Sequence, residues 1–179
     1  MVRRAPNIVV TGTPGTGKST TAELIAGSST NVPMRHFNIS ELVKQNNLYE
    51  RYDEEWDSYV VDEDKLLDWL EPQTADGGLI LDWHACEPFP ERWIDLVVVL
   101  RCDHTKLWER LEARGYPLKK IQENNESEIM EVILAEAREN YTQEIVVELA
   151  SESTDELQAN VERIVQWIEN WVNDHPDGV

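Results

Sequence analysis

The residues whose spacing points most directly to chemistry lie near the amino terminus, in the run Gly-Thr-Pro-Gly-Thr-Gly-Lys-Ser from Gly12 to Ser19. A glycine, four residues, a second glycine, lysine and then serine is the spacing of a phosphate-binding loop. The glycines let backbone N–H groups approach phosphate oxygens without a Cβ in the way. Lys18 would then supply a positive charge for β- and γ-phosphates, and the Ser19 hydroxyl could join the coordination of Mg²⁺.

The segments on either side of this loop must position it, and both have the expected character. Residues 7–11 are short, apolar and β-branched, which is typical of a buried parallel strand. Residues 19–26 read as a helix with Leu24 and Ile25 on one face, and Gly27 is placed to end it. Strand, loop and helix therefore follow in the order that a phosphate-binding loop requires. The alternative, a glycine-rich turn without a ligand, does not need these flanks.

Strands and helices alternate along the rest of the chain. Asp62 and Asp103 are expected caps of two of the helices, Ser40 of a third, and Pro72 is expected to follow a helix end. Four further strands are predicted over 34–39, 77–82, 95–101 and 144–149, helices over 40–44, 62–71, 104–114, 126–141 and 154–173, and an irregular segment over 48–59. The pattern predicts one α/β domain over residues 1–179, with a five-stranded parallel sheet covered by helices on both faces.

Composition narrows the possible partners. Thirty-five acidic against sixteen basic residues give a formal charge of −19, which argues against broad nucleic-acid binding. The excess of acid favours solubility or, as the sharper alternative, a basic protein partner. No apolar run approaches the ~20 residues of a membrane span, and the first six residues contain no signal-peptide apolar region. We expect a protein of the cytosol or nucleus, in which Cys86 and Cys102 form no disulfide framework.

Two side chains after the third predicted strand could take part in phosphoryl chemistry. Asp82 ends that strand and is the expected carboxylate near Mg²⁺, because ligands lie outside the carboxyl ends of parallel strands. Its alternative role is a strand-terminating cap. His84 follows two residues later and could orient or deprotonate a water molecule. It could equally be a histidine that is merely hydrogen-bonded.

Three of the arginines in this chain have a functional interpretation. Arg110 and Arg114 lie four residues apart on one helical face before Gly115. Planar guanidinium groups stabilise the charge of a transferring phosphoryl, so we expect these two in a lid that closes over a nucleotide. A solvated helix end is the alternative. Arg92 could reach a second substrate or pair with a neighbouring glutamate.

Several short runs together resemble one family. The loop itself looks like that of adenylate kinases, and more specific runs extend the likeness. These runs are Tyr52-Asp53-Glu54-Glu55-Trp56, Val61-Asp62-Glu63-Asp64, Asp82-Trp83-His84, Pro90-Glu91-Arg92-Trp93 and Glu109 to Tyr116. Together with the tryptophan-bearing last helix, they closely resemble the adenylate kinase isoenzyme 6 family. The resemblance extends from about Pro6 to His175. The family comprises nuclear adenylate kinases and ATPases of small ribosomal subunit assembly.

The resemblance implies a P-loop NTPase fold of the nucleoside monophosphate kinase type. It implies a monophosphate-binding flap over residues 38–61 and a short lid over 113–123, with Arg114 touching ATP and with Asp82 and His84 supporting hydrolysis. Asn38, Lys44 and Arg92 are the expected AMP contacts. ATP is expected at Gly15, Thr16, Gly17, Lys18, Ser19 and Thr20. A basic protein of the small ribosomal subunit is the implied partner, and nucleus and cytoplasm are the expected locations.

Two departures from the family pattern bear on activity. Lys44 stands where the flap can carry an arginine, and lysine lacks the bidentate fork that binds a phosphate most firmly. The segment after Tyr116 also lacks the second arginine pair of ordinary adenylate kinases. We expect an Mg²⁺-dependent transfer of the ATP γ-phosphoryl group to AMP with slower ATP hydrolysis. The alternatives are an ATPase switch that acts on a basic ribosomal protein, and a kinase of another small metabolite.

Overall fold

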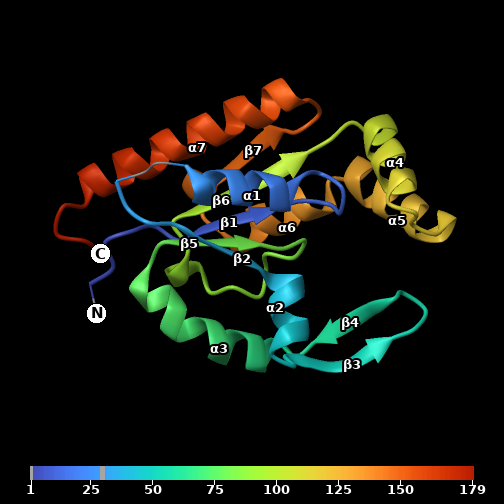
Figure 1. The fold of residues 1–179 in the computed structure, drawn as a ribbon, viewed down its shortest axis with the longest axis horizontal. Coiled ribbons are helices and arrows are strands. Elements are labelled where there is room, and N and C mark those ends of the chain that lie inside the picture. Colours follow the sequence, from blue (N-terminus) through green and yellow to red (C-terminus); the bar gives the residue numbers. More distant parts are fainter. Residues whose placement is uncertain (1, 29–30) are drawn as a thin grey trace.

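A five-stranded parallel sheet forms the centre of the molecule (Figure 1), as the sequence predicts. The computed structural model describes residues 2–28 and 31–179, so Met1 of the expected domain lies outside the described residues. The strand order is β2-β5-β1-β6-β7. The strands are β1 (Ile8–Thr11), β2 (Arg35–Asn38), β5 (Leu79–Asp82), β6 (Leu96–Arg101) and β7 (Val146–Ala150).

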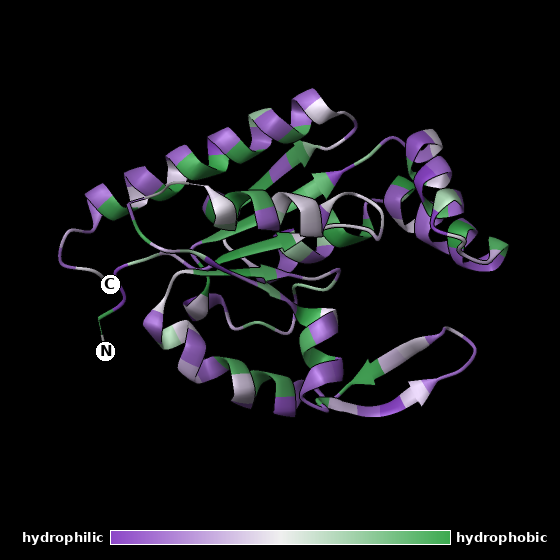
Figure 2. Ribbon diagram, viewed as in Figure 1, coloured by the Kyte–Doolittle hydropathy of each residue, from purple (hydrophilic) through white to green (hydrophobic). Residues whose placement is uncertain are grey.

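Helices cover both faces of this sheet because side chains alternate along each central strand. Ile8 and Val10 point to one core, which α1 (Lys18–Gly27) and α7 (Thr154–Asp174) complete. Val9 belongs to the opposite core. That second core is completed by α2 (Ile39–Gln45), α3 (Glu63–Asp76) and α6 (Val132–Asn140). Figure 2 shows the strands largely hydrophobic and α7 striped, the pattern of a helix with one buried face.

Two appendages project beyond the sheet on the side where its strands end. One is the antiparallel hairpin of β3 (Tyr49–Asp53) and β4 (Ser58–Val61). The other consists of α4 (His104–Ala113) and α5 (Leu118–Ile129), which share a small core of their own. Figure 1 shows them at the same end of the molecule. Short 3₁₀ turns occupy Glu91–Trp93 and Gln143–Ile145.

The expectation of an irregular segment over residues 48–59 is wrong, because these residues form the paired hairpin, whose register shifts only between Tyr49 and Arg51. Its strands are held together by aromatic pairs: the Tyr59 ring centroid lies 4.5 Å from that of Tyr49 and 5.2 Å from that of Tyr52. Cross-strand aromatic pairs stabilise an antiparallel ribbon even where the hydrophobic alternation is weak. The sequence of this segment has no clear hydrophobic alternation, so it did not predict the two strands.

Three expected helix boundaries also need correction. Pro72 lies inside α3, which continues to Asp76, because the side chain of the buried Asn7 donates to the Thr74 carbonyl at 2.9 Å and secures the last turn. Asn38 rather than Ser40 caps α2, accepting from the Glu41 N–H at 3.1 Å. The expected helix over 126–141 is two helices, and α5 starts earlier, at 118.

The break between α5 and α6 falls at Glu131, which has a left-handed φ of 57°. Ile129, the last residue of α5, is 60% exposed. The buried contacts of Glu128, described below, fix the end of α5 against the sheet and override the helical pattern. The other expected caps, Asp62 and Asp103, are confirmed by hydrogen bonds from Lys65 N and Thr105 N. Within the described residues, no helix is both long and apolar enough to cross a bilayer.

Candidate active site

The phosphate-binding loop follows β1 and leads directly into α1. Gly12 has φ +149°, and a Cβ there would lie 2.7 Å from the Leu100 carbonyl oxygen. Gly15 has φ +95°, and a Cβ there would lie 2.8 Å from Leu107 of α4. Both positions combine a positive φ with a close approach, so side chains would distort the loop. Gly12, the first glycine of the spacing, and Gly15 within the loop are therefore required by the backbone itself.

The rest of the loop is held by its own polar groups and by the segment after β7. The buried Thr16 hydroxyl donates to the Thr13 carbonyl at 2.8 Å, and the Ser151 hydroxyl donates to the Thr16 carbonyl at 2.6 Å. At the start of α1, the Thr21 hydroxyl donates to the Gly17 carbonyl at 2.8 Å. Gly17 has a left-handed φ of 91°. These contacts hold the loop shape independently of any ligand.

Lys18 is the loop's cation and lies folded along it. Its Nζ donates to the carbonyl oxygens of Gly12 and Thr13 at 3.0 and 3.3 Å. Burial lowers the pKa of Lys18 from 10.5 to about 8; Asp82 opposes that shift, while the Arg114 charge adds to it. An incoming anion would stabilise the ammonium form, which is the property that a phosphate-binding lysine needs.

Ser19 and Asp82 meet where the strands end. The Ser19 hydroxyl donates to Asp82 Oδ2 at 2.6 Å, and Nε2 of His36 lies 3.0 Å from the same oxygen. Asn38 donates to the Ser19 hydroxyl at 3.3 Å. The parallel register places Asn38 beside Asp82 on neighbouring strands. The structure thus brings together three predicted residues and adds His36, which the sequence analysis missed.

The donor set at this point suits Mg²⁺. A serine hydroxyl and a carboxylate are hard oxygen ligands, and Mg²⁺ in such sites takes few protein ligands beside phosphate oxygens and water. Residues 2–28 and 31–179 contain no cluster of three or more histidine, cysteine or acidic side chains able to hold a metal. Ser19 and Asp82 are the residues that would hold the ion.

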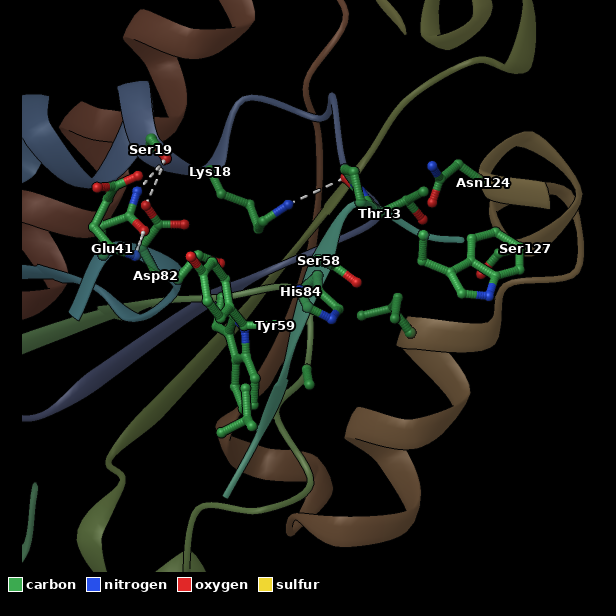
Figure 3. Close-up of a pocket in the computed structure, with 18 of the residues that line it drawn as sticks. Thr13, Lys18, Ser19, Glu41, Ser58, Tyr59, Asp82, His84, Asn124 and Ser127 are labelled. Carbon is green, nitrogen blue, oxygen red and sulfur yellow. Dashed lines mark hydrogen bonds between the residues drawn. The ribbon is translucent and has the colours of Figure 1, made fainter. Parts of the chain in front are cut away.

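A cavity of about 930 Å³ opens from this metal-type pair toward the hairpin and α5 (Figure 3). Three cations line it, Lys18, Arg114 and Lys120, and none of them has a carboxylate within 4 Å in the described chain. Tyr59 and Trp56 contribute aromatic surface on the hairpin side. The lining also contains four carboxylates, those of Glu41, Glu63, Asp82 and Glu87. In a chain with net charge −19, three cations without a carboxylate partner still favour an anionic ligand.

His84 projects into the same cavity, as Figure 3 shows. Although its ring faces the open space, the surrounding protein and then the Lys18 charge lower the pKa of His84 to about 4. The imidazole is therefore neutral at pH 7 and able to accept a hydrogen bond. Its ring centroid lies 5.3 Å from that of Trp83, in an edge-on arrangement.

A second, smaller cavity of about 250 Å³ lies on the other side of the loop. Thr20 and Arg110 line it, and Arg114 lines both cavities. NH1 of Arg110 donates to the carbonyls of Gly15 and Ser151 at 3.2 and 2.9 Å. Arg110 therefore ties the phosphate-binding loop to the segment after β7, and the structure does not bring it to the larger cavity.

Lys44 and Arg92, the expected AMP contacts, do not line the larger cavity. Lys44 Nζ lies 3.9 Å from Glu41 and 5.8 Å from the Tyr59 ring centroid, two residues of the cavity wall, whereas Arg92 pairs with Glu71 at 3.4 Å. Both side chains are at least half exposed. In so acidic a chain, a glutamate is close to each of these two cations. For Arg92, the open alternative of pairing with a glutamate is the one observed.

Glu128 is the main buried charge that the sequence did not disclose. Its side chain accepts from the Thr13 hydroxyl at 2.6 Å and from Arg101 Nε at 2.7 Å, and a third donor, the Cys102 N–H, lies at 3.1 Å. Only 3% of Glu128 is exposed. The carboxylate links the phosphate-binding loop, the end of β6 and α5. An acidic residue in a polar stretch gives no signal of such a role.

The fold and this site together define a P-loop protein of the kinase type, and comparisons with known proteins agree. A family model described as "AAA domain" matches residues 8–131. The shikimate kinase of Bacteroides thetaiotaomicron shares the fold, with a TM-score of 0.54 at 14% identity over 92% of this chain and 98% of that one.

Sequence relatives are much closer. The "Adenylate kinase isoenzyme 6 homolog" of Schizosaccharomyces pombe is 56% identical over 97% of both chains. The "Adenylate kinase isoenzyme 6 homolog FAP7" of Saccharomyces cerevisiae is 51% identical over 99% of this chain and 89% of its own. The chain therefore belongs to the adenylate kinase isoenzyme 6 family, as its motifs indicate.

Proposed function

We propose that the protein transfers the γ-phosphoryl group of Mg²⁺-bound ATP to AMP and hydrolyses ATP more slowly. The observation that carries this proposal is the larger cavity: three cations without carboxylate partners face a Ser19–Asp82 pair on a phosphate-binding loop. Preorganised cations of this kind would stabilise the charge that develops on a transferring phosphoryl group.

Two cavities that meet at Arg114 suggest how the nucleotides lie. The donor nucleoside would occupy the smaller cavity, with its phosphates across the loop N–H groups and Lys18. The acceptor would enter the larger one, whose hairpin side offers Tyr59 and Trp56 to a base. Aromatic and aliphatic surface there favours a nucleotide over a sugar acid as the acceptor.

The transfer needs no general base. An anionic oxygen of AMP forms the new bond to the γ-phosphorus, while the bond to the β–γ bridging oxygen breaks and ADP leaves with its electron pair. Bound Mg²⁺ would neutralise phosphate charge. Hydrolysis instead requires a water molecule to be aligned, and the neutral His84 ring could align it by accepting its hydrogen bond.

A specific experiment tests the proposal. Purified protein is mixed with Mg²⁺, ATP and AMP, and ADP is quantified, with Lys18→Ala and Lys44→Ala as a matched pair of variants. We expect the wild type to require AMP for fast ADP formation, Lys18→Ala to be inactive, and Lys44→Ala to stay within about threefold of the wild type. If AMP were not phosphorylated while another metabolite was, AMP would not be the acceptor.

A second candidate function, a role in small-subunit maturation in nucleus and cytoplasm, rests on the family and on the formal charge of −19. An acidic surface suits a basic ribosomal protein electrostatically, and ATP hydrolysis would reset their complex. Partner-stimulated phosphate release without AMP supports this switch. Release that the partner leaves unchanged, beside fast AMP-dependent turnover, contradicts it.

A further inference from the structure

Two adjacent lysines near the start of α5 have different surroundings. Lys119 is exposed and lies 2.7 Å from Glu55 at the hairpin tip, with its Nζ 4.6 Å from the Trp56 ring centroid. Lys120 is half-buried and lines the larger cavity. Its Nζ donates to the Trp56 carbonyl at 3.3 Å and lies 4.7 Å from the Tyr116 ring centroid.

The environment of Lys120 is that of a cation without a charge partner. No carboxylate lies within 4 Å of its Nζ in the described part of the chain, although thirty-five acidic residues are available in the sequence. Its charge also reaches His84, where it contributes to lowering that pKa. A neutral carbonyl and a ring face are weak partners for an ammonium group. They would be readily exchanged for phosphate oxygens.

We propose that Lys120 binds phosphate oxygens at the junction between donor and acceptor, an inference that rests on the proposed function. It reaches the cavity from α5, whereas Lys18 belongs to the loop, so the phosphate chain would have ammonium groups from two separate elements. Lysine's flexible four-carbon stem and three donors allow it to leave the Trp56 carbonyl and follow the phosphate chain. Lys119 tethers the hairpin tip and contacts no phosphate.

The test compares Lys120→Gln with Lys119→Gln. Calorimetry measures the affinity of each variant for ADP, ATP and diadenosine pentaphosphate in the presence of Mg²⁺. We expect Lys120→Gln to weaken the pentaphosphate about tenfold or more and ADP by less than about threefold. Lys119→Gln should stay near wild type for all three ligands, and Lys120→Arg should retain most of the pentaphosphate affinity.

The comparison with Lys119→Gln separates phosphate binding from a structural role. If Lys120 only held the hairpin in place, Lys119→Gln, which removes another tether of the same hairpin tip, would weaken the pentaphosphate as much as Lys120→Gln. An equal loss for ADP and pentaphosphate, or a Lys120→Gln variant as tight as wild type, overturns this inference while leaving the proposed function standing. A wild-type protein that binds none of the three nucleotides would overturn both. Thermal midpoints of the variants verify that they are folded.

Discussion

Nε2 of His36 lies 3.0 Å from Oδ2 of Asp82, and the same oxygen accepts the Ser19 hydroxyl. His36 belongs to the edge strand β2, and Asp82 ends the neighbouring β5. A donor behind a metal-binding carboxylate fixes its orientation and tunes its affinity. His36 thus prepares the predicted metal site from a strand that contributes nothing to the phosphate-binding loop.

Replacing His36 by phenylalanine should weaken Mg²⁺ without removing the nucleotide site. We expect the Mg²⁺ concentration for half-maximal stabilisation of the ATP complex to rise about tenfold, because outer contacts to ligands typically contribute on that order. Thermal unfolding at fixed ATP and varied Mg²⁺ measures it. His104→Phe is the control, since His104 is exposed and lies 3.7 Å from the capping Asp103. An equal shift in both variants contradicts the role of His36.

Nucleotide binding should be linked to protonation of Lys18. In the protein without nucleotide, burial holds the pKa of the Lys18 ammonium group near 8. Because bound phosphates raise that pKa, Lys18 should take up a large fraction of one proton when the nucleotide binds at pH 9. At pH 7 the lysine is already protonated and little uptake follows. Calorimetry in two buffers of different ionisation enthalpy measures this. His84→Gln should leave the uptake at pH 9 intact, and a wild type without buffer dependence at pH 9 contradicts the assignment.

The same pKa shift has a consequence for stability. Between pH 8 and 10.5 the unfolded chain binds more protons at Lys18 than the folded one, so this residue's contribution to the free energy of unfolding rises with pH in that window. Below pH 8 the amount by which the buried Lys18 ammonium group lowers the free energy of unfolding no longer changes with pH. Lys18→Met should therefore raise the thermal midpoint at pH 7 while abolishing turnover. Chemical unfolding of the wild type and of Lys18→Met at pH 7 and pH 10 measures their free energies of unfolding. We expect the difference between the two proteins to be smaller at pH 10 than at pH 7.

Removing the buried charge of Glu128 should destabilise the fold. Glu128→Gln weakens the pair with Arg101, in which the glutamate side chain is 4% exposed, and we expect a loss of about 2–3 kcal/mol. Glu131→Gln is the matched control, because that carboxylate is 57% exposed and 3.4 Å from the same arginine, so its loss should stay below about 1 kcal/mol. Urea unfolding gives both values. Similar losses would show that burial does not set the strength of the pair.

His84 should separate hydrolysis from transfer. Because AMP carries its own anionic nucleophile, His84→Ala should lower ATP hydrolysis about a hundredfold and AMP-dependent ADP formation by less than about threefold. The two rates are measured on the same preparations with and without AMP. Equal falls in both would place His84 in nucleotide binding rather than in water alignment.

Sequence alone determined those features that depend on local spacing. The run from Gly12 to Ser19 specifies its own backbone, and β-branched strands between amphipathic helices specify the parallel sheet that carries Asp82 to the loop. Aromatic pairing in the hairpin left no periodic signal, so that element was not foreseen.

Only the tertiary structure decided which charged groups face the cavity and which pair on the surface. Thr13 and Glu128 are 115 residues apart, and His36 and Asp82 are 46 apart, so no local pattern relates them. Arg92 and Lys44 have the residue type of a phosphate contact but do not line the cavity, whereas Lys120, for which the sequence indicated only a place in the expected lid, lines it. The sequence determines which side chains carry a charge, but the packing of distant elements determines which partner neutralises it.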